Sequence, residues 1–283
     1  MDPSHQGDRR GMIDAHQHIW QIGEHGCAWP TAAEGPIFRD YSLDDFRAAA
    51  QPHGVTATVL VQSQEDDRDT DWLLAVAGQD ETIAGVVGWA DLRDLERISA
   101  LASRPKHVGL RPIVQHREAD WYDRSQLEPG WRAMIEQGLR LDALVRVQHL
   151  ASLDRLAARH PGLPIVIDHA AKPEIDSPEG YQRWHEAIGP LAERPNVYCK
   201  LSGLLTERGT APAEAIEPYV GAILGLFGPD RVMWGSDWPV LELVSNYGDW
   251  FSQARRLVPK AAHEAVFGAT AARFYGLKTE VAA

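Results

Sequence analysis

The sequence lacks the features that mark secreted, membrane-spanning and disulfide-stabilised proteins. Only two cysteines occur among 283 residues, Cys27 and Cys199, and they form neither a disulfide framework nor a CxxC pair. The first apolar stretch, Met12–Trp20, is too short and too polar at its histidines for a signal sequence or a membrane span. We therefore expect free thiols, a cytoplasmic location and no membrane partner.

Basic residues are also scarce. Lysine and arginine together number 28 against 40 aspartates and glutamates, which gives a formal net charge of −12. No basic run alternates with aromatic residues, so the sequence argues against a nucleic-acid partner or an anionic membrane surface. Solubility is the plainer explanation of the negative charge.

What the chain does contain is typical of a globular protein with a large core, because 44% of its residues are hydrophobic and 24% are charged. Its length would allow two domains of roughly 150 residues, but barrels commonly form one unit of about 250. No change in composition divides the chain. We expect a disordered lead-in over residues 1–11, which are polar, and a single catalytic domain over residues 12–283.

Short apolar, β-branched runs alternate with longer stretches of helical periodicity, a pattern that predicts a parallel sheet covered by helices. The eight predicted strands are Met12–Ala15, Thr56–Val61, Ile83–Trp89, Val108–Leu110, Ala143–Val147, Pro164–Ile167, Asn196–Leu201 and Val232–Trp234. The predicted helices include Leu43–Ala50, Asp71–Ala77, Leu153–His160, Tyr181–Ala192 and Ala213–Leu226.

Eight such units favour a closed α/β barrel, the (β/α)₈ or TIM barrel, over a doubly wound open sheet. The open sheet is disfavoured because no Gly-x-Gly-x-x-Gly motif follows the first strand. It would also hold the polar residues after the first and last strands far apart. The segment Gln21–Tyr41 is rich in Gly, Pro and aromatic residues and lacks periodicity, so we expect a loop over the barrel mouth.

Two histidines end the first predicted strand. His16 and His18 are two residues apart, and alternation along a strand places both on one face. At the carboxyl end of a barrel strand that face is the mouth, where active sites of this fold lie. The alternative is a pair of surface histidines on a loop.

The sixth apolar run delivers Asp168 and His169 at its end, with Lys172 three residues further on. Polar groups in such a place are typically functional. The alternative is a helix-capping aspartate beside a hydrogen-bonded histidine.

The last strand ends with Asp237 between Trp234 and Trp238. Burial there, on the strand that closes the barrel against the first, would raise the pKa of the carboxyl group and suit it to act as a general base. The alternative is an aspartate whose carboxylate is satisfied by turn amides before Pro239.

Taken together, these motifs resemble the amidohydrolase superfamily, and within it the amidohydrolase-2 family of sugar-acid lactonases and 2-pyrone-4,6-dicarboxylate lactonases. The matching runs are Ile13-Asp14-Ala15-His16-Gln17-His18-Ile19-Trp20, Thr58-Val59-Leu60-Val61-Gln62, Gly85-Val86-Val87-Gly88-Trp89, Gly109-Leu110-Arg111, Ile167-Asp168-His169-Ala170-Ala171-Lys172-Pro173, Lys200-Leu201-Ser202-Gly203 and Trp234-Gly235-Ser236-Asp237-Trp238-Pro239. The resemblance implies a barrel with His16, His18, His169 and Asp237 as its site.

Members with two metal ions also need a bridging modified lysine on the fourth or fifth strand. This sequence offers Arg111 and Arg146 there, so a two-metal centre is not expected. The three histidines and Asp237 could hold one divalent ion such as Zn²⁺. They could equally work without a metal, because an ester needs less activation than an amide, and members of this lactonase family resemble that second case. We expect that no cofactor is required.

The resulting hypothesis is hydrolysis of a sugar-acid lactone of the fucono-, rhamnono- or galactono- type. Asp237 would activate water, and the three histidines would stabilise the oxyanion. A pyrone dicarboxylate would require more converging arginines. Alternatives are a metal-dependent decarboxylase of the same superfamily and a non-catalytic ligand-binding barrel. The oligomeric state stays open. The expected substrate-binding residues are Lys172, Arg111, Trp29, Trp89 and Trp238, with Trp20 also near the first loop.

Overall fold

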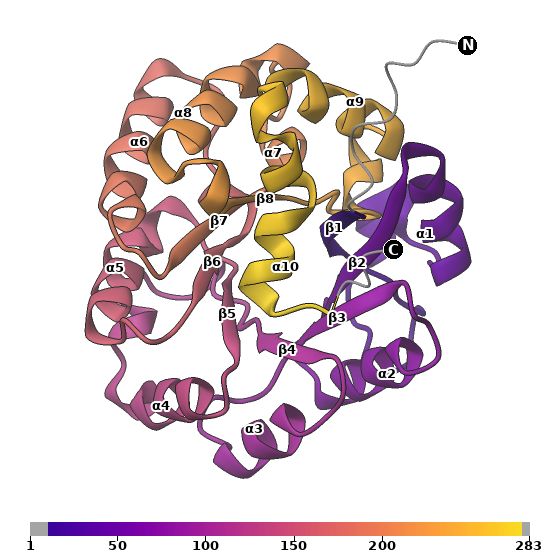
Figure 1. Ribbon diagram of the computed structural model, residues 1–283, viewed down its shortest axis with the longest axis vertical. Helices are drawn as coiled ribbons and strands as arrows, with labels where there is room; N and C mark the ends of the chain where they lie inside the picture. The colour runs from indigo at the N-terminus through magenta and orange to yellow at the C-terminus, as the bar shows by residue number, and fades with distance from the viewer. Residues whose placement is uncertain (1–10, 279–283) are drawn as a thin grey trace.

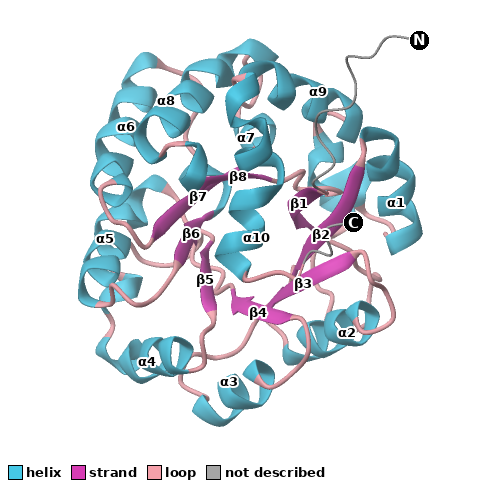
Figure 2. Ribbon diagram, in the orientation of Figure 1, coloured by secondary structure: helices cyan, strands magenta, loops and turns pink. Residues whose placement is uncertain are grey.

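Eight parallel strands follow one another around a barrel, and helices surround them (Figures 1 and 2). The computed structural model describes residues 11–278, so most of the expected lead-in lies outside the described residues. Neighbouring strands are hydrogen-bonded in chain order from the first to the eighth, which confirms the predicted barrel. The strands are β1 (Met12–Gln17), β2 (Val55–Val61), β3 (Ile83–Gly88), β4 (His107–Leu110), β5 (Arg140–Ala143), β6 (Ile165–Ile167), β7 (Val197–Leu201) and β8 (Val232–Trp234).

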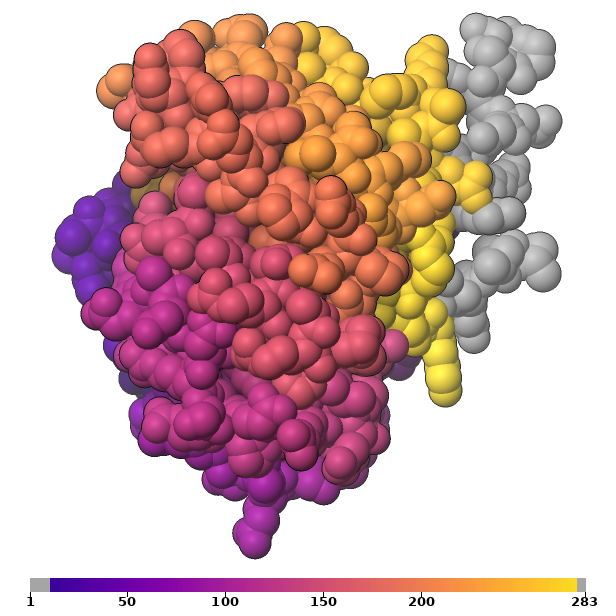
Figure 3. Space-filling model, turned by 90° about the vertical axis from the view of Figure 1, so that its left-hand side faces the viewer, coloured from indigo at the N-terminus to yellow at the C-terminus, as the bar shows by residue number. Residues whose placement is uncertain are grey.

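The outer helices follow the order of the strands around the barrel (Figure 1). Figure 3 shows this on one side of the molecule, where the surface colour changes gradually from magenta to yellow. None of the helices within residues 11–278 is long and apolar enough to cross a membrane. The helices are α1 (Leu43–Ala50), α2 (Asp67–Ala77), α3 (Leu95–Ala102), α4 (Glu128–Glu136), α5 (Leu150–Arg159), α6 (Pro178–Ala192), α7 (Leu204–Glu207), α8 (Glu217–Phe227), α9 (Tyr247–Leu257) and α10 (Thr270–Tyr275). Contacts such as α3 with α4, α5 with α6 and α1 with α9 join neighbours in this ring.

Local sequence signals fix the helix starts where the prediction was accurate. The Ser42 hydroxyl accepts a hydrogen bond from the amide of Asp45, whose carboxylate accepts one from the Ser42 amide. This capping box satisfies two otherwise unpaired donors and starts α1 at Leu43, as predicted. Its carboxyl end passes through a short turn to Gly54, whose φ of 81° reverses the chain into β2.

The fifth strand is the one whose predicted position is wrong. We expected Ala143–Val147, whereas β5 runs over Arg140–Ala143. The apolar run was misleading because Asp142, within the true strand, points to the barrel interior and is paired there with Lys200. Beyond Ala143 the chain makes only an isolated bridge before it turns into a short 3₁₀ helix.

The barrel closes between β1 and the segment that follows β8. The Asp237 amide donates a hydrogen bond to the His16 carbonyl oxygen at 2.8 Å, and the His18 amide donates to the Trp238 carbonyl oxygen, also at 2.8 Å. These bonds bring the two ends of the sheet together at the carboxyl edge. The histidine pair and the last-strand aspartate therefore share one place in the fold.

The opposite end of the barrel is filled by α10, which lies within the ring of strands in Figure 1. Its Phe274 and Tyr275 pack in one buried cluster with interior residues such as Ile13, Val59 and Met233. The amino end of the barrel is thus a packed floor.

Candidate active site

A bulge in β1 turns His16 into the barrel, and His18 follows directly after the strand. Between Asp14 and Gln17, β1 contains one residue more than the facing stretch of β2. Asp14 points outward, and its carboxylate accepts a hydrogen bond of 2.9 Å from the Tyr247 hydroxyl on α9. His16 and His18 lie on the other side of the sheet, where their Nε2 atoms are 3.1 Å apart.

Asp237 is held in a conformation that non-glycine residues rarely adopt. Its φ is 57°, in the left-handed region, and its side chain is almost fully buried. Strain of this kind is common where a catalytic group has to be aimed. Two residues earlier, a Cβ atom on Gly235 would lie 2.6 Å from the Cβ atom of His16, so only glycine lets the two strand ends approach this closely.

His169 lies at the start of an unusual left-handed turn. Four consecutive residues, His169 to Lys172, have φ values between 50° and 65°. The turn holds the imidazole against Gly203, where an added Cβ would lie 2.5 Å from its Nδ1 atom. The Ser202 hydroxyl is 2.9 Å from the same nitrogen.

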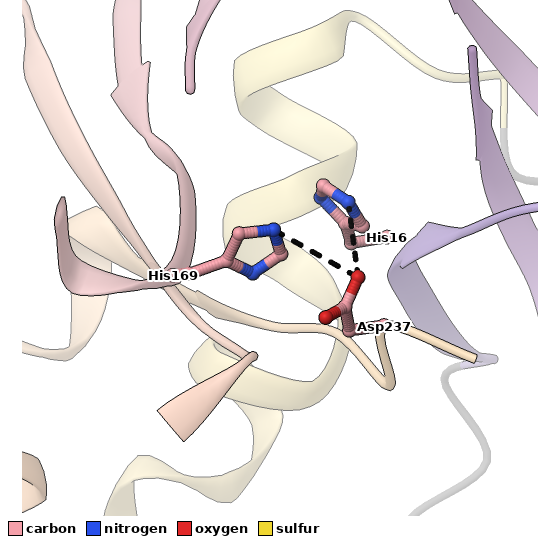
Figure 4. Close-up of side chains that lie close together, drawn as sticks. All are labelled: His16, His169 and Asp237. Atoms are coloured by element: carbon pink, nitrogen blue, oxygen red, sulfur yellow. Dashed lines mark ion pairs between the residues drawn. The ribbon is translucent and has the colours of Figure 1, made fainter. Parts of the chain in front are cut away.

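The three histidines converge on one carboxylate oxygen. Asp237 Oδ1 lies 3.4 Å from the Nε2 atom of His18, 3.6 Å from that of His16 and 3.8 Å from that of His169. Figure 4 shows the rings of His16, on β1, and His169, in the turn after β6, both facing this oxygen. The four residues that the sequence singled out therefore form one cluster.

The charge state of this cluster differs from the sequence expectation. Burial alone would raise the pKa of Asp237, but the three surrounding histidines outweigh it and hold the pKa below its ordinary value. The expected raised pKa is therefore wrong. Burial also lowers the pKa of His18, and it lowers that of His169 to about 4. At neutral pH the carboxylate is ionised and both imidazoles are neutral.

A cavity of about 360 Å³ opens beside the cluster. His18, His169 and Asp237 form part of its wall, together with Arg111 and Lys172. The wall also contains Trp29, which the predicted mouth loop supplies.

Three other expected residues lie elsewhere among the described residues. His16 is fully buried behind the wall, and Trp89 is not part of it. Trp238 packs edge-on against Tyr41 and donates a hydrogen bond to Glu242, so its indole belongs to the core beside the mouth.

Sequence reasoning missed several polar groups around the cavity. Gln64, Glu65, Gln115 and His116 line it and come from loops after β2 and β4, where no motif marked them. A more informative omission is Lys200 on β7, which is fully buried. A charged residue inside an apolar strand is itself a signal, because burying an ammonium group is costly unless it is paired.

Three of the clustered side chains could together hold a metal ion. Ligand atoms of His16, His169 and Asp237 lie within 4.8 Å of one another, a spacing that could admit one ion. However, His16 Nδ1 lies 3.0 Å from the ammonium nitrogen of Lys200. That cation needs a lone pair on Nδ1, which leaves the hydrogen on Nε2, the atom that faces the other two groups. As arranged, His16 does not fit a resident metal ion.

Known proteins provide independent information. The family model described as amidohydrolase matches residues 13–277. An L-fucono-1,5-lactonase from Burkholderia ambifaria is 44% identical, over 93% of this chain and 94% of its own. An L-fucono-1,5-lactonase from Burkholderia multivorans is 35% identical, and the match covers 94% of this chain and 96% of the relative.

Solved structures agree with the fold. Crystal structures of an amidohydrolase from Burkholderia multivorans, one with bound HEPES and one with bound zinc, superpose with a TM-score of 0.89 at 33% identity. The superposition covers 95% of this chain and the whole of the Burkholderia multivorans chain.

Proposed function

The chain belongs to the amidohydrolase family, and on that basis we propose that it hydrolyses a small sugar-acid lactone, with a 1,5-lactone of the L-fucono type as the first candidate. The proposal rests mainly on the ionised Asp237 in the wall of the cavity, in a chain 44% identical to a lactonase. A cytoplasmic location accompanies the proposal, since both cysteines are free thiols.

The cavity suits a monosaccharide ring. A volume of about 360 Å³ is at the small end of ligand sites. Trp29 offers an indole for the C–H groups of a sugar ring, while Gln64, Glu65 and His116 offer groups that can bind hydroxyls. Arg111 and Lys172 supply positive charge on the same wall.

In the proposed reaction, Asp237 accepts a proton from water as the water oxygen attacks the lactone carbonyl carbon. Its lowered pKa makes it a weak base, so the carbonyl has to be polarised as well. His169, Lys172 and Arg111 are placed in the wall to donate hydrogen bonds to the developing oxyanion. Donors of this kind typically contribute about 10²–10³ in rate each. The tetrahedral intermediate then collapses, the ring C–O bond breaks, and Asp237 returns its proton to the leaving oxygen.

His16 and His18 have a different part in this proposal from the one expected. His16 is buried behind the wall, so it supports the carboxylate from within the barrel and does not touch substrate. His18 borders both the cavity and Asp237. The proton taken from water is held on Asp237 Oδ1 until the ring opens, with His18 Nε2 3.4 Å away.

We propose further that turnover requires no metal ion, because His16 does not present a lone pair to the site. A metal-dependent decarboxylase, the second candidate, would need that ion. A panel of sugar 1,4- and 1,5-lactones, assayed by acid release with a pH indicator, tests the main proposal. We expect the fastest hydrolysis for a six-carbon 1,5-lactone. Absence of hydrolysis across the panel, together with release of CO₂ from an aromatic acid, would replace the proposal with the second candidate.

A further inference from the structure

A fully buried ionic cluster lies beneath the catalytic residues. The Lys200 ammonium nitrogen is 2.5 Å from Asp142 Oδ2, 3.0 Å from Asp168 Oδ1 and 3.0 Å from His16 Nδ1. All four side chains are fully buried. The Tyr275 hydroxyl of α10 donates a further hydrogen bond of 2.7 Å to Asp142 Oδ2.

The number of protons on Lys200 determines where His16 carries its own. An ammonium group has three N–H donors and no acceptor, and here it faces three acceptor positions. Asp142 Oδ2 and His16 Nδ1 lie in hydrogen-bond geometry around the ammonium group, and Asp168 Oδ1 forms an ion pair with it, so one ammonium proton points at His16 Nδ1. If Nδ1 carried a hydrogen, Asp168 Oδ1 would lie 3.4 Å away as a possible acceptor, but the hydrogen would also face the ammonium donor, whose nitrogen is 3.0 Å from Nδ1 inside a low-dielectric core. His16 therefore carries its hydrogen on Nε2.

The neighbouring histidine fits this assignment. His18 Nδ1 lies 2.7 Å from the Val61 carbonyl oxygen, which can only accept, so His18 carries its hydrogen on Nδ1. A neutral His18 then has a lone pair on Nε2. His16 Nε2, 3.1 Å away, donates to that lone pair. Each hydrogen in the chain from Lys200 to Val61 thus has one donor and one acceptor.

We propose that Lys200 is a positioning residue that locks His16 in the tautomer with its hydrogen on Nε2. This tautomer makes His16 a hydrogen-bond donor toward His18 and the neighbouring Asp237 carboxylate, and it withdraws His16 from metal binding. The catalytic part of this inference rests on the proposed lactone hydrolysis. The tautomer and the metal preference do not, because both can be measured without a substrate.

The link to metal binding follows from the same proton count. A histidine ligates through a lone pair, so a divalent ion at His16 Nε2 would require the hydrogen to move to Nδ1. The moved hydrogen would then point at the Lys200 ammonium group. A metal ion and the Lys200 contact therefore compete for His16, and loss of the ammonium group should favour the ion.

The test uses a charge-balanced variant. Lys200→Met alone leaves buried carboxylates without their cation and can fail to fold. The double variant Lys200→Met with Asp142→Asn removes one positive and one negative charge together, and the amide can still accept from Tyr275. Lys106→Met is the matched control, because that lysine binds backbone carbonyls of Ala77 and Asp80.

Two measurements on the purified full chain decide the matter. Long-range ¹H–¹⁵N spectra of imidazoles, with His16 assigned by its loss in His16→Gln, should show hydrogen on Nε2 in the unchanged protein and in Lys106→Met. In the double variant we expect loss of that single tautomer. Zn²⁺ binding, measured by competition with a chromophoric chelator, should tighten by at least about tenfold in the double variant only.

The outcomes are separable from those of the lactonase proposal. Hydrogen on His16 Nδ1 in the unchanged protein, or unaltered zinc affinity in a folded double variant, would overturn the role of Lys200. If the lactone panel shows turnover, the double variant should lose kcat with little change in KM, since Lys200 does not touch substrate. If the panel shows none while the tautomer and zinc results hold, the proposed reaction fails and the positioning role stands.

Discussion

One carboxylate oxygen of Asp237 lies 3.4 Å from the Nε2 atom of His18, at the edge of the cavity. Both are acceptors in the resting state, and both face the same Nε2 hydrogen of His16. The single lone pair on His18 Nε2 already accepts from His16, so a proton arriving from water is taken up by Asp237 Oδ1. The same closure of the barrel between β1 and the segment after β8 therefore places the proposed base beside the histidines.

Replacement of Asp237 by asparagine should lower kcat for lactone hydrolysis by at least about a hundredfold, because the amide cannot accept the proton of water. Asparagine tolerates the left-handed φ of 57°, so the melting temperature should change little. Initial rates and a thermal melt on the same preparation check both points. A folded variant with near-normal turnover would remove Asp237 from the mechanism.

Replacement of Lys172 by alanine should raise KM more than it lowers kcat, since its ammonium group lines the cavity but is paired with Glu207 at 3.0 Å. Glu207→Gln, which frees the lysine without removing it, is the matched control and should affect KM less. The base would be misassigned if Lys172→Ala and Asp237→Asn lost activity equally, with the same altered pH profile.

On the acidic side, the pH profile of kcat/KM should fall at a pH well below the pKa of an ordinary histidine. Burial lowers the pKa of His169 to about 4, and Asp237 ionises below its usual range, so both are deprotonated above that pH. We expect kcat/KM to be level from neutral pH downward and to fall as the pH drops through about 4, where the cluster takes up its proton. An inflection near 6.5 would show that a histidine with an ordinary pKa controls the reaction.

Removal of divalent ions should leave lactone hydrolysis largely intact. A zinc-dependent enzyme would lose activity at once, because metal-bound water would be its nucleophile. Rates before and after prolonged treatment with a strong chelator, with elemental analysis of each sample, provide the measurement. Inactive stripped enzyme that regains its full rate with one equivalent of Zn²⁺ or Mn²⁺ per chain would contradict the metal-free mechanism.

Replacement of Gly235 by alanine should destabilise the protein by about 1–3 kcal/mol and reduce activity, because the new Cβ would lie 2.6 Å from that of His16. Gly189 in α6 is a suitable control, since a Cβ there meets nothing within 4 Å. Alanine at Gly189 should be neutral or stabilising. Chemical denaturation of both variants compares the two sites, and equal stability would refute the proposed crowding at the strand ends.

The barrel and its main site residues could be predicted because their signals are local. The end of each of these strands is marked in the sequence by an apolar run followed directly by polar residues, as in Ile167-Asp168-His169. The order of eight such runs then fixes which ends meet, because parallel strands of a barrel share one mouth. The expected position of His16, His18, His169 and Asp237 in one cluster followed from this topology.

The remaining features depend on pairs far apart in the chain. The position of β5 was mispredicted because Asp142 is a charged residue inside the strand. Its partner, Lys200, lies 58 residues away, and nothing near either residue reveals the pairing. The bulge that turns His16 inward is visible only against β2. The sign of the Asp237 pKa shift likewise depends on how closely three imidazoles approach, which no sequence spacing encodes.

The Tyr275 hydroxyl, supplied by the last helix, completes the bonding of the cluster under His16. During synthesis the first strand, with both of its histidines, leaves the ribosome long before this residue does. A growing chain can therefore assemble most of its strands while the base of its active site is still missing. We therefore expect catalytic competence only after α10 has docked, so activity in a translation mixture would report the completion of the polypeptide and not the folding of its early strands.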